Sequence, residues 1–143
     1  MNTNNIKTHR NQDQTFHVSK AKRNERFYRK YDLDNSTFNE WSVITLFYAS
    51  LHYIDAVLSQ DTNLSDELRD PRNHQIRKRA VSQCRYLLPI AAEYFDLADR
   101  SWQARYHRTF FEEGILNNMK RNLFEPIQKH VREYLGINLE AES

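Results

Sequence analysis

The sequence predicts an all-α protein, an antiparallel up-and-down bundle of four to five helices in a single domain. Glycine and proline number only two and three among 143 residues, whereas all-β proteins need many turns built from those residues. Apolar residues also recur at helical spacing over three long stretches. Short segments join these stretches, as antiparallel neighbours in a bundle require.

The N-terminal part of the chain is basic. Residues 1–31 contain eight Lys or Arg and two acidic residues, whereas the rest of the chain has an excess of acid. We expect residues 1–9 to be disordered, residues 10–136 to form the domain and residues 137–143 to be a tail. Residues 10–31 form a weakly patterned first helix, which either meets a phosphate backbone or is a solvated terminal segment. The residues that recur at helical spacing in this segment are Phe16, Lys20, Arg23, Phe27 and Tyr31.

The second helix has the clearest pattern. Ser36 or Thr37 supplies an N-cap, and Thr37 with Glu40 forms a capping box. Apolar side chains then repeat every three or four residues to about residue 60. They are Val43, Phe47, Leu51, Ile54 and Leu58. The polar residues 61–70 are expected to form a loop.

Two further helices follow. Pro71 suits the first turn of the third helix, which Pro89 should kink or divide. Residues 99–110 are expected to be a connection, and the last helix covers about residues 111–135, with a kink at Pro126 and a stop at Gly136. The apolar side of the third helix comprises Ile76, Ala80, Val81, Cys84, Leu87, Leu88, Ile90, Ala91, Tyr94 and Leu97. That of the last helix comprises Ile115, Met119, Leu123, Ile127, Val131, Tyr134 and Leu135.

Several classes of protein are disfavoured. Cys84 is the only cysteine, which excludes an intramolecular disulfide and favours a reducing cytoplasm. The first ten residues lack the apolar core of a signal peptide, and the longest apolar run, residues 43–51, is half of the roughly 20 residues of a membrane span. No glycine-rich phosphate loop, HExxH motif or metal-ligand spacing occurs, so we expect no cofactor, no metal and no membrane partner. Cys84 itself is expected to be a packed thiol.

Polar residues interrupt the apolar faces at two places. Tyr48, His52 and Asp55 share one face of the second helix, where Asp55 would orient His52 and raise its pKa. They form either a buried network that fixes helix packing or an active or binding face. His74 and Arg77, three residues apart, begin a basic stretch that is either solvated or in contact with phosphate.

The stretch "RSWQARYHRTFF", residues 100–111, combines basic and aromatic residues. Metal-independent RNA cleavage needs a histidine to move protons and an arginine to stabilise the charged phosphorane. His107 fits the first role, and Arg100 and Arg105 fit the second. The alternative is that these residues serve only packing or the surface.

Three segments together resemble an uncharacterised bacterial group of HEPN-like helical domains. They are "FYASLHYIDAVL" (47–58), "DPRNHQIRKRAV" (70–81) and "YFDLADRSWQARY" (94–106), within a region of about half of the chain. The positions that mark this group match His52, His74, Arg77, Arg105 and Tyr106. The Arg–His motif of the HEPN ribonucleases would instead fall on Arg100 and His107.

The resemblance implies a helical bundle that often dimerises. It also implies one of two alternative functions. The first is a metal-independent endoribonuclease or RNA-binding effector in antiviral defence or a toxin–antitoxin system, with His107 as the acid or base and Arg100 and Arg105 on the phosphate. The second is a non-catalytic interaction module that dimerises or binds an antitoxin, a larger effector or a nucleotidyltransferase. If the Arg–His motif is accidental, the site is the inward polar cluster of Tyr48, His52, Asp55, His74, Arg77, Arg105 and Tyr106.

Overall fold

The computed structural model describes residues 3–30, 39–106 and 113–136, and within these ranges the chain is helical with no strand. The longer helices are α1 (Thr3–Lys30), α2 (Asn39–Leu58), α4 (His74–Gln83), α5 (Ala91–Tyr106) and α7 (Glu125–Leu135). The shorter elements are α3 (Asp66–Arg69), the 3-10 turn η2 (Leu88–Ile90), α6 (Glu113–Met119) and the π-helical segment η3 (Lys120–Phe124).

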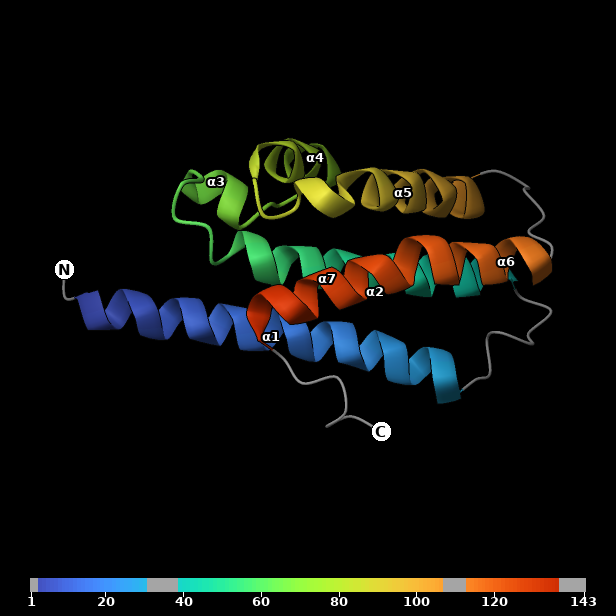
Figure 1. Cartoon of the computed structure of the whole chain (residues 1–143), viewed down its shortest axis with the longest axis horizontal. Coiled ribbons are helices and arrows are strands. Elements are labelled where there is room, and N and C mark those ends of the chain that lie inside the picture. Colours follow the sequence, from blue (N-terminus) through green and yellow to red (C-terminus); the bar gives the residue numbers. More distant parts are fainter. Residues whose placement is uncertain (1–2, 31–38, 107–112, 137–143) are drawn as a thin grey trace.

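The helices form a bundle around α2. Figure 1 shows α1, α2, α5 and the α6–α7 stretch running alternately in opposite directions, with α1 and α5 on opposite sides of α2. α2 packs against α1, α5 and α7, and also touches α3, α4, α6 and η3. The predicted all-α class and helical bundle are therefore confirmed.

α1 differs from the sequence prediction in its start and in its buried face. It begins at Thr3, so residues 3–9 belong to the helix rather than to a disordered segment. No glycine or proline occurs between residues 3 and 30 to interrupt a helix. The predicted face is also wrong, because Phe16 and Phe27 are exposed. Its buried apolar side chains are Val18, Ala21 and Tyr28.

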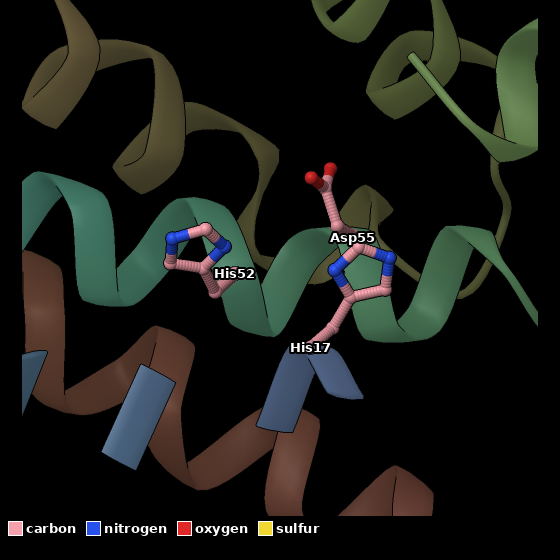
Figure 2. A group of neighbouring side chains, drawn as sticks. All are labelled: His17, His52 and Asp55. Atoms are coloured by element: carbon pink, nitrogen blue, oxygen red, sulfur yellow. The ribbon is translucent and has the colours of Figure 1, made fainter. Parts of the chain in front are cut away.

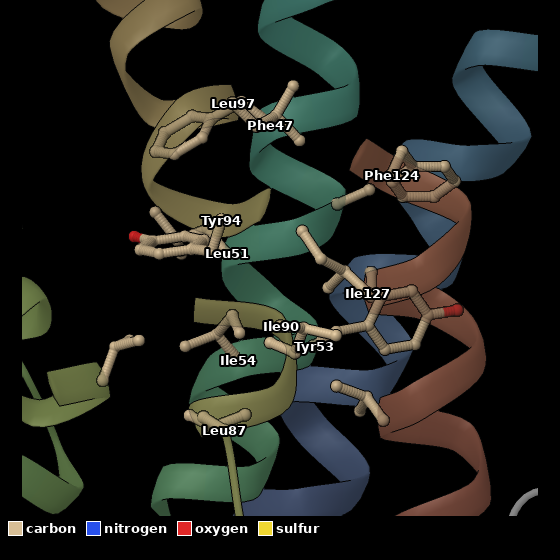
Figure 3. Close-up of a cluster of buried hydrophobic side chains, with 14 of the residues drawn as sticks. Phe47, Leu51, Tyr53, Ile54, Leu87, Ile90, Tyr94, Leu97, Phe124 and Ile127 are labelled. Atoms are coloured by element: carbon tan, nitrogen blue, oxygen red, sulfur yellow. The ribbon is translucent and has the colours of Figure 1, made fainter. Parts of the chain in front are cut away.

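The predicted apolar stripe of α2 is buried at all five positions. Most of the other side chains of α2 are buried as well, because the helix has neighbours on several sides. Figure 3 shows its side chains meeting those of the segment from Leu87 to Leu97 on one side and of Phe124 and Ile127 on the other. The predicted capping residues Ser36 and Thr37 lie outside the described residues, as does Tyr31.

α2 is also long and apolar enough, between Trp41 and Leu58, to cross a membrane by length and composition. The uninterrupted apolar run within it, residues 43–51, is too short to indicate this property. Most of the stretch is buried inside the bundle, as expected for the central helix of a core.

The chain between α2 and α5 is divided more finely than predicted. α3 lies within the expected loop, and α4 begins at His74 rather than at Pro71. The reason is Asn73, whose side chain accepts a hydrogen bond of 2.9 Å from the backbone N–H of Ile76 and caps the helix. Cys84 is buried after α4, and this burial raises the pKa of its thiol to about 11, as expected for a packed thiol.

Pro89 divides the predicted third helix rather than kinking it. It lies in η2, a separate short turn that leads into α5, and the neighbouring Leu88 is exposed. α5 continues to Tyr106, so the predicted connection over residues 99–110 is helical through residue 106. Arg100 and Arg105 therefore lie on a helix.

The predicted last helix contains one wide turn. η3 is π-helical and inserts about one extra residue per turn immediately before Pro126, which lacks a backbone N–H. The wide turn places Phe124 rather than Leu123 on the buried face, whereas Met119, Ile127 and Val131 are buried as predicted. Before η3, Leu116 is buried in place of the predicted Ile115. Gly136 ends α7 with φ +70°, which confirms the predicted stop.

A buried polar network joins α1, α2 and α7. The Arg132 guanidinium donates to Glu25 at 3.1 Å and to the Tyr53 hydroxyl at 3.0 and 2.7 Å. Tyr53 donates in turn to Glu25 at 2.7 Å, and the Gln128 amide donates to the same carboxylate at 2.7 Å. Each group in this network has partners, which is the condition for burying charge in a bundle.

Candidate functional site

The polar residues of α2 and α4 meet in a buried ion pair. Arg77 donates to both carboxylate oxygens of Asp55, from Nε at 2.8 Å and from Nη2 at 3.0 Å, and Nη2 also donates to the carbonyl oxygen of Pro71 at 3.2 Å. Burial raises the pKa of the Asp55 carboxyl, and the hydrogen bonds and charge of Arg77 oppose that rise. The pair fixes the start of α4 against α2.

Because of this pairing, the first turn of α4 lies beside Phe47 of α2. The ring centroids of His74 and Phe47 are 5.8 Å apart. Burial lowers the pKa of His74, and the positive charges of Arg77, Arg105 and Lys78 lower it further. Its imidazole is therefore neutral at neutral pH, the form in which a histidine accepts a proton.

A cavity of about 680 Å³ opens between α2, α4 and α5. Its lining combines basic and aromatic side chains with a single acid, Asp99, which lies 3.9 Å from the Lys78 ammonium. The basic and aromatic members are His74, Lys78, Arg105, Phe47, Tyr94 and Trp102. The volume is in the range of small-ligand sites, and the lining suits a ligand that is both anionic and aromatic.

Arg105 is the best-held cation of this cavity. Its Nη1 donates to the Tyr48 hydroxyl at 2.8 Å, and its guanidinium carbon lies 5.5 Å from the centroid of the Tyr48 ring and 5.9 Å from that of Phe47. Its Nε is buried and has no hydrogen-bond partner among the described residues. A guanidinium held in this way at the lining of a cavity is positioned to contact an anion such as phosphate.

Tyr106 stands at the exposed edge of the same helix. Its ring centroid is 5.7 Å from the Arg105 guanidinium carbon and 5.5 Å from the Trp102 ring. Trp102 is 51% exposed and Tyr106 is 65% exposed. The two rings form a platform on which a base or an apolar partner group can stack.

Arg100 is not part of this arrangement. It lies five residues before Arg105, about 140° around the helix, and pairs with Asp96 at 3.0 Å. It lines a separate hollow with Gly114, Ile115 and Asn118. His107, the predicted acid or base, lies outside the described residues.

The predicted chain from Tyr48 through His52 to Asp55 is not formed. Tyr48 bonds to Arg105 and Asp55 to Arg77, and Nδ1 of His52 is buried without a hydrogen-bond partner among the described residues. The predicted rise in the pKa of His52 is also wrong. Burial lowers that pKa to about 4, assisted by the charges of Lys20, His17 and Arg77.

Acid should therefore destabilise the fold through His52. The pKa of His52 is about 4 in the folded chain, against 6.5 for an unperturbed histidine. The unfolded chain therefore binds more protons than the folded chain between these two pH values. We expect the free energy of unfolding in EDTA to fall as the pH drops from about 6.5 towards 4, and His52→Gln to reduce this fall. Urea unfolding of both proteins across this range measures it. Equal pH dependence in the two would contradict the assignment.

Sequence reasoning missed Lys78 and Trp102 as cavity residues. Lys78 follows His74 by four positions, and Trp102 precedes Arg105 by three, so each shares a helix face with a predicted residue. Helical periodicity would have identified both, but only if α4 and α5 had been known to face each other. The long helix predicted over residues 71–98 concealed that arrangement.

Comparison of the chain with models of protein families, with curated proteins and with solved structures finds no match.

Proposed function

We propose that this protein is an HEPN-like RNA-binding domain whose ligand site is the cavity between α2, α4 and α5. The observation that carries the proposal is the convergence of His74, Lys78 and Arg105 on one cavity with aromatic walls. RNA presents the two matching features, a phosphate backbone and unstacked bases that stack on aromatic rings. The proposed setting is the cytoplasm, in antiviral defence or a toxin–antitoxin system.

In this proposal each side chain has a separate task. Lys78 and Arg105 bind phosphate oxygens, and Trp102 with Tyr106 stacks a base at the mouth of the cavity. Asp55 and Arg77 do not touch the ligand, but they hold α4, and therefore His74 and Lys78, in position.

The same side chains could support metal-independent cleavage. A neutral His74 would accept the proton of a 2′-hydroxyl, and the charge of Arg105 would stabilise the phosphorane that follows. The 2′-oxygen would attack phosphorus and form a 2′,3′-cyclic phosphate. The bond from phosphorus to the 5′-oxygen of the next nucleotide would break, and that oxygen would take up a proton from water. This role replaces that of His107 as the favoured acid or base, and Arg100 has no part in it.

Arg105→Ala should weaken binding of a labelled single-stranded RNA by about ten- to a hundredfold, the range expected when a charge-assisted hydrogen bond is lost. Fluorescence anisotropy at a fixed salt concentration measures the change. Arg100→Ala is the matched control, because it removes the same charge from the other face of α5 and should leave the affinity nearly unchanged. Equal effects of the two substitutions would refute the assignment of the cavity.

Cleavage is tested in EDTA with the same RNA and with transfer RNA. If His74 moves the proton, His74→Ala abolishes cleavage and keeps the helical circular dichroism spectrum, whereas Arg100→Ala/His107→Ala retains cleavage. The reverse pattern would assign catalysis to the Arg–His motif, Arg100 and His107. Binding without cleavage in the wild-type protein would define a non-catalytic RNA-binding domain.

A second candidate is an interaction module that dimerises or binds a larger protein. The observation that favours it is the exposed pair Trp102 and Tyr106, since large aromatic side chains are enriched at protein interfaces. Light scattering on the purified protein, with and without Trp102→Ala, separates the two. A dimer that Trp102→Ala dissociates, together with absence of RNA binding, would favour this module.

A further inference from the structure

A second cluster of chemically active groups lies where α1 crosses α2, away from the cavity. Figure 2 shows His17 of α1 close to His52 and Asp55 of α2. One ring nitrogen of each histidine and one carboxylate oxygen lie within 4.8 Å of one another. None of the three residues lines the 680 Å³ cavity.

Both histidines of this cluster carry an unsatisfied atom. The Nδ1 atoms of His17 and His52 are buried and have no hydrogen-bond partner among the described residues. Buried polar atoms in native proteins nearly always have a partner, so two unsatisfied ring nitrogens at one place need an explanation. Water could satisfy one such atom, but the neighbouring carboxylate adds the negative charge that a cation requires.

We propose that His17, His52 and Asp55 bind one divalent transition-metal ion of the zinc type. Two imidazoles and one carboxylate are a common protein donor set for Zn²⁺, with a water molecule as the fourth ligand. Donors around tetrahedral zinc lie about 3.4 Å apart, given bond lengths of about 2.1 Å. Small side-chain rotations that draw the three groups together would reach this geometry.

The surroundings of the cluster favour zinc over harder cations. Arg77 occupies both oxygens of Asp55, but each oxygen has a second lone pair that can accept a metal. Arg77 would then orient the ligating carboxylate, as partners behind metal ligands do. Lys20 and Arg77 also add positive charge nearby, so affinity must come from the imidazoles, which Mg²⁺ and Ca²⁺ bind poorly.

The ion would join α1 to the central helix. Within residues 13–29, the part of α1 whose side chains the structure describes, the buried apolar side chains are Val18, Ala21 and Tyr28. A cross-link at His17 would hold the basic N-terminal helix against α2. The role is structural, and none of the three ligands lines the proposed RNA site.

The test is a titration of the full chain with Co²⁺, whose visible absorption reports tetrahedral nitrogen and oxygen ligands, followed by displacement with Zn²⁺. We expect one equivalent to bind and the thermal midpoint to rise. His17→Gln and His52→Gln should each weaken the affinity more than about a hundredfold, beyond the loss typical of partners behind the ligands. His74→Gln removes an exposed histidine on α4, outside the cluster, and this variant should bind Co²⁺ with the affinity of the wild-type protein.

Circular dichroism confirms that each variant is folded, and the wild-type protein supplies a measurement that needs no variant. On addition of Zn²⁺, the ring protons of two of the six histidines should shift in nuclear magnetic resonance spectra while the others stay in place. Absence of saturable Co²⁺ binding, or binding that survives in both His17→Gln and His52→Gln, overturns the proposal. Because the RNA measurements are made in EDTA, either proposal can fail alone.

Discussion

Asp55→Ala is expected to lower the free energy of unfolding by about 3–5 kcal/mol, the cost of leaving a buried charge without its partner. Arg77 is 7% exposed and gives two hydrogen bonds to Asp55. It cannot become neutral, so after the substitution its charge stays buried, and the carbonyl oxygen of Pro71 is its one remaining hydrogen-bond acceptor among the described residues. Urea unfolding at neutral pH in EDTA measures the loss.

The double variant Asp55→Leu/Arg77→Met is the control for this pair. Buried ion pairs replaced on both sides by apolar residues of similar volume often cost little, so we expect the double variant to recover most of the loss. If Asp55→Ala costs less than about 1 kcal/mol, as exposed pairs do, the ion pair is not buried in solution. The RNA affinity of the double variant further shows whether the position of α4 depends on the pair.

Glu25→Ala is expected to have an effect of similar size, about 3–5 kcal/mol, in the network that joins α1, α2 and α7. It removes a carboxylate that accepts from Arg132, which is 3% exposed, and it deprives Tyr53 and Gln128 of that acceptor. Tyr53 still accepts from Arg132 after the substitution. Chemical unfolding monitored by circular dichroism is the measurement.

Glu25→Gln separates charge from hydrogen bonding in this network. Its amide oxygen still accepts from Tyr53, so the loss should be smaller, about 1–3 kcal/mol, the cost of a hydrogen bond to a charged group. Equal losses for Glu25→Ala and Glu25→Gln would mean that charge alone matters. No loss for either would place Arg132 in water rather than in the core.

The sequence predicted the parts of the fold that depend on strong periodicity. All five positions of the α2 stripe are buried because the helix is central and any apolar side chain on it finds a neighbour. The face of α1 was predicted wrongly because its two exposed phenylalanines outweighed small buried residues such as Ala21 in the pattern. In the last helix, Met119, Ile127 and Val131 are buried as predicted, but Phe124 is buried in place of Leu123, because the π turn η3 has no simple signature before Pro126.

The candidate site was harder to predict, for a reason of geometry. The residues that carry it lie on three helices, and spacing along one helix cannot reveal a neighbour on another. Tyr48 and Asp55 share a face of α2, but their partners, Arg105 and Arg77, come from α5 and α4. His17 was missed for the same reason, since it is 35 residues from His52 in sequence and meets it only through the packing of α1 on α2.

The central position of α2 has a consequence for how the bundle comes apart. This helix packs against η3 and against every other α-helix that the structure describes, so α2 is the shared wall of several interfaces. Loss of one peripheral helix exposes only one side of α2. Loss of α2, in contrast, removes a packing partner from every peripheral helix at once. Opening of α2 therefore amounts to global unfolding, while the peripheral helices can open as smaller cooperative units with free energies of their own.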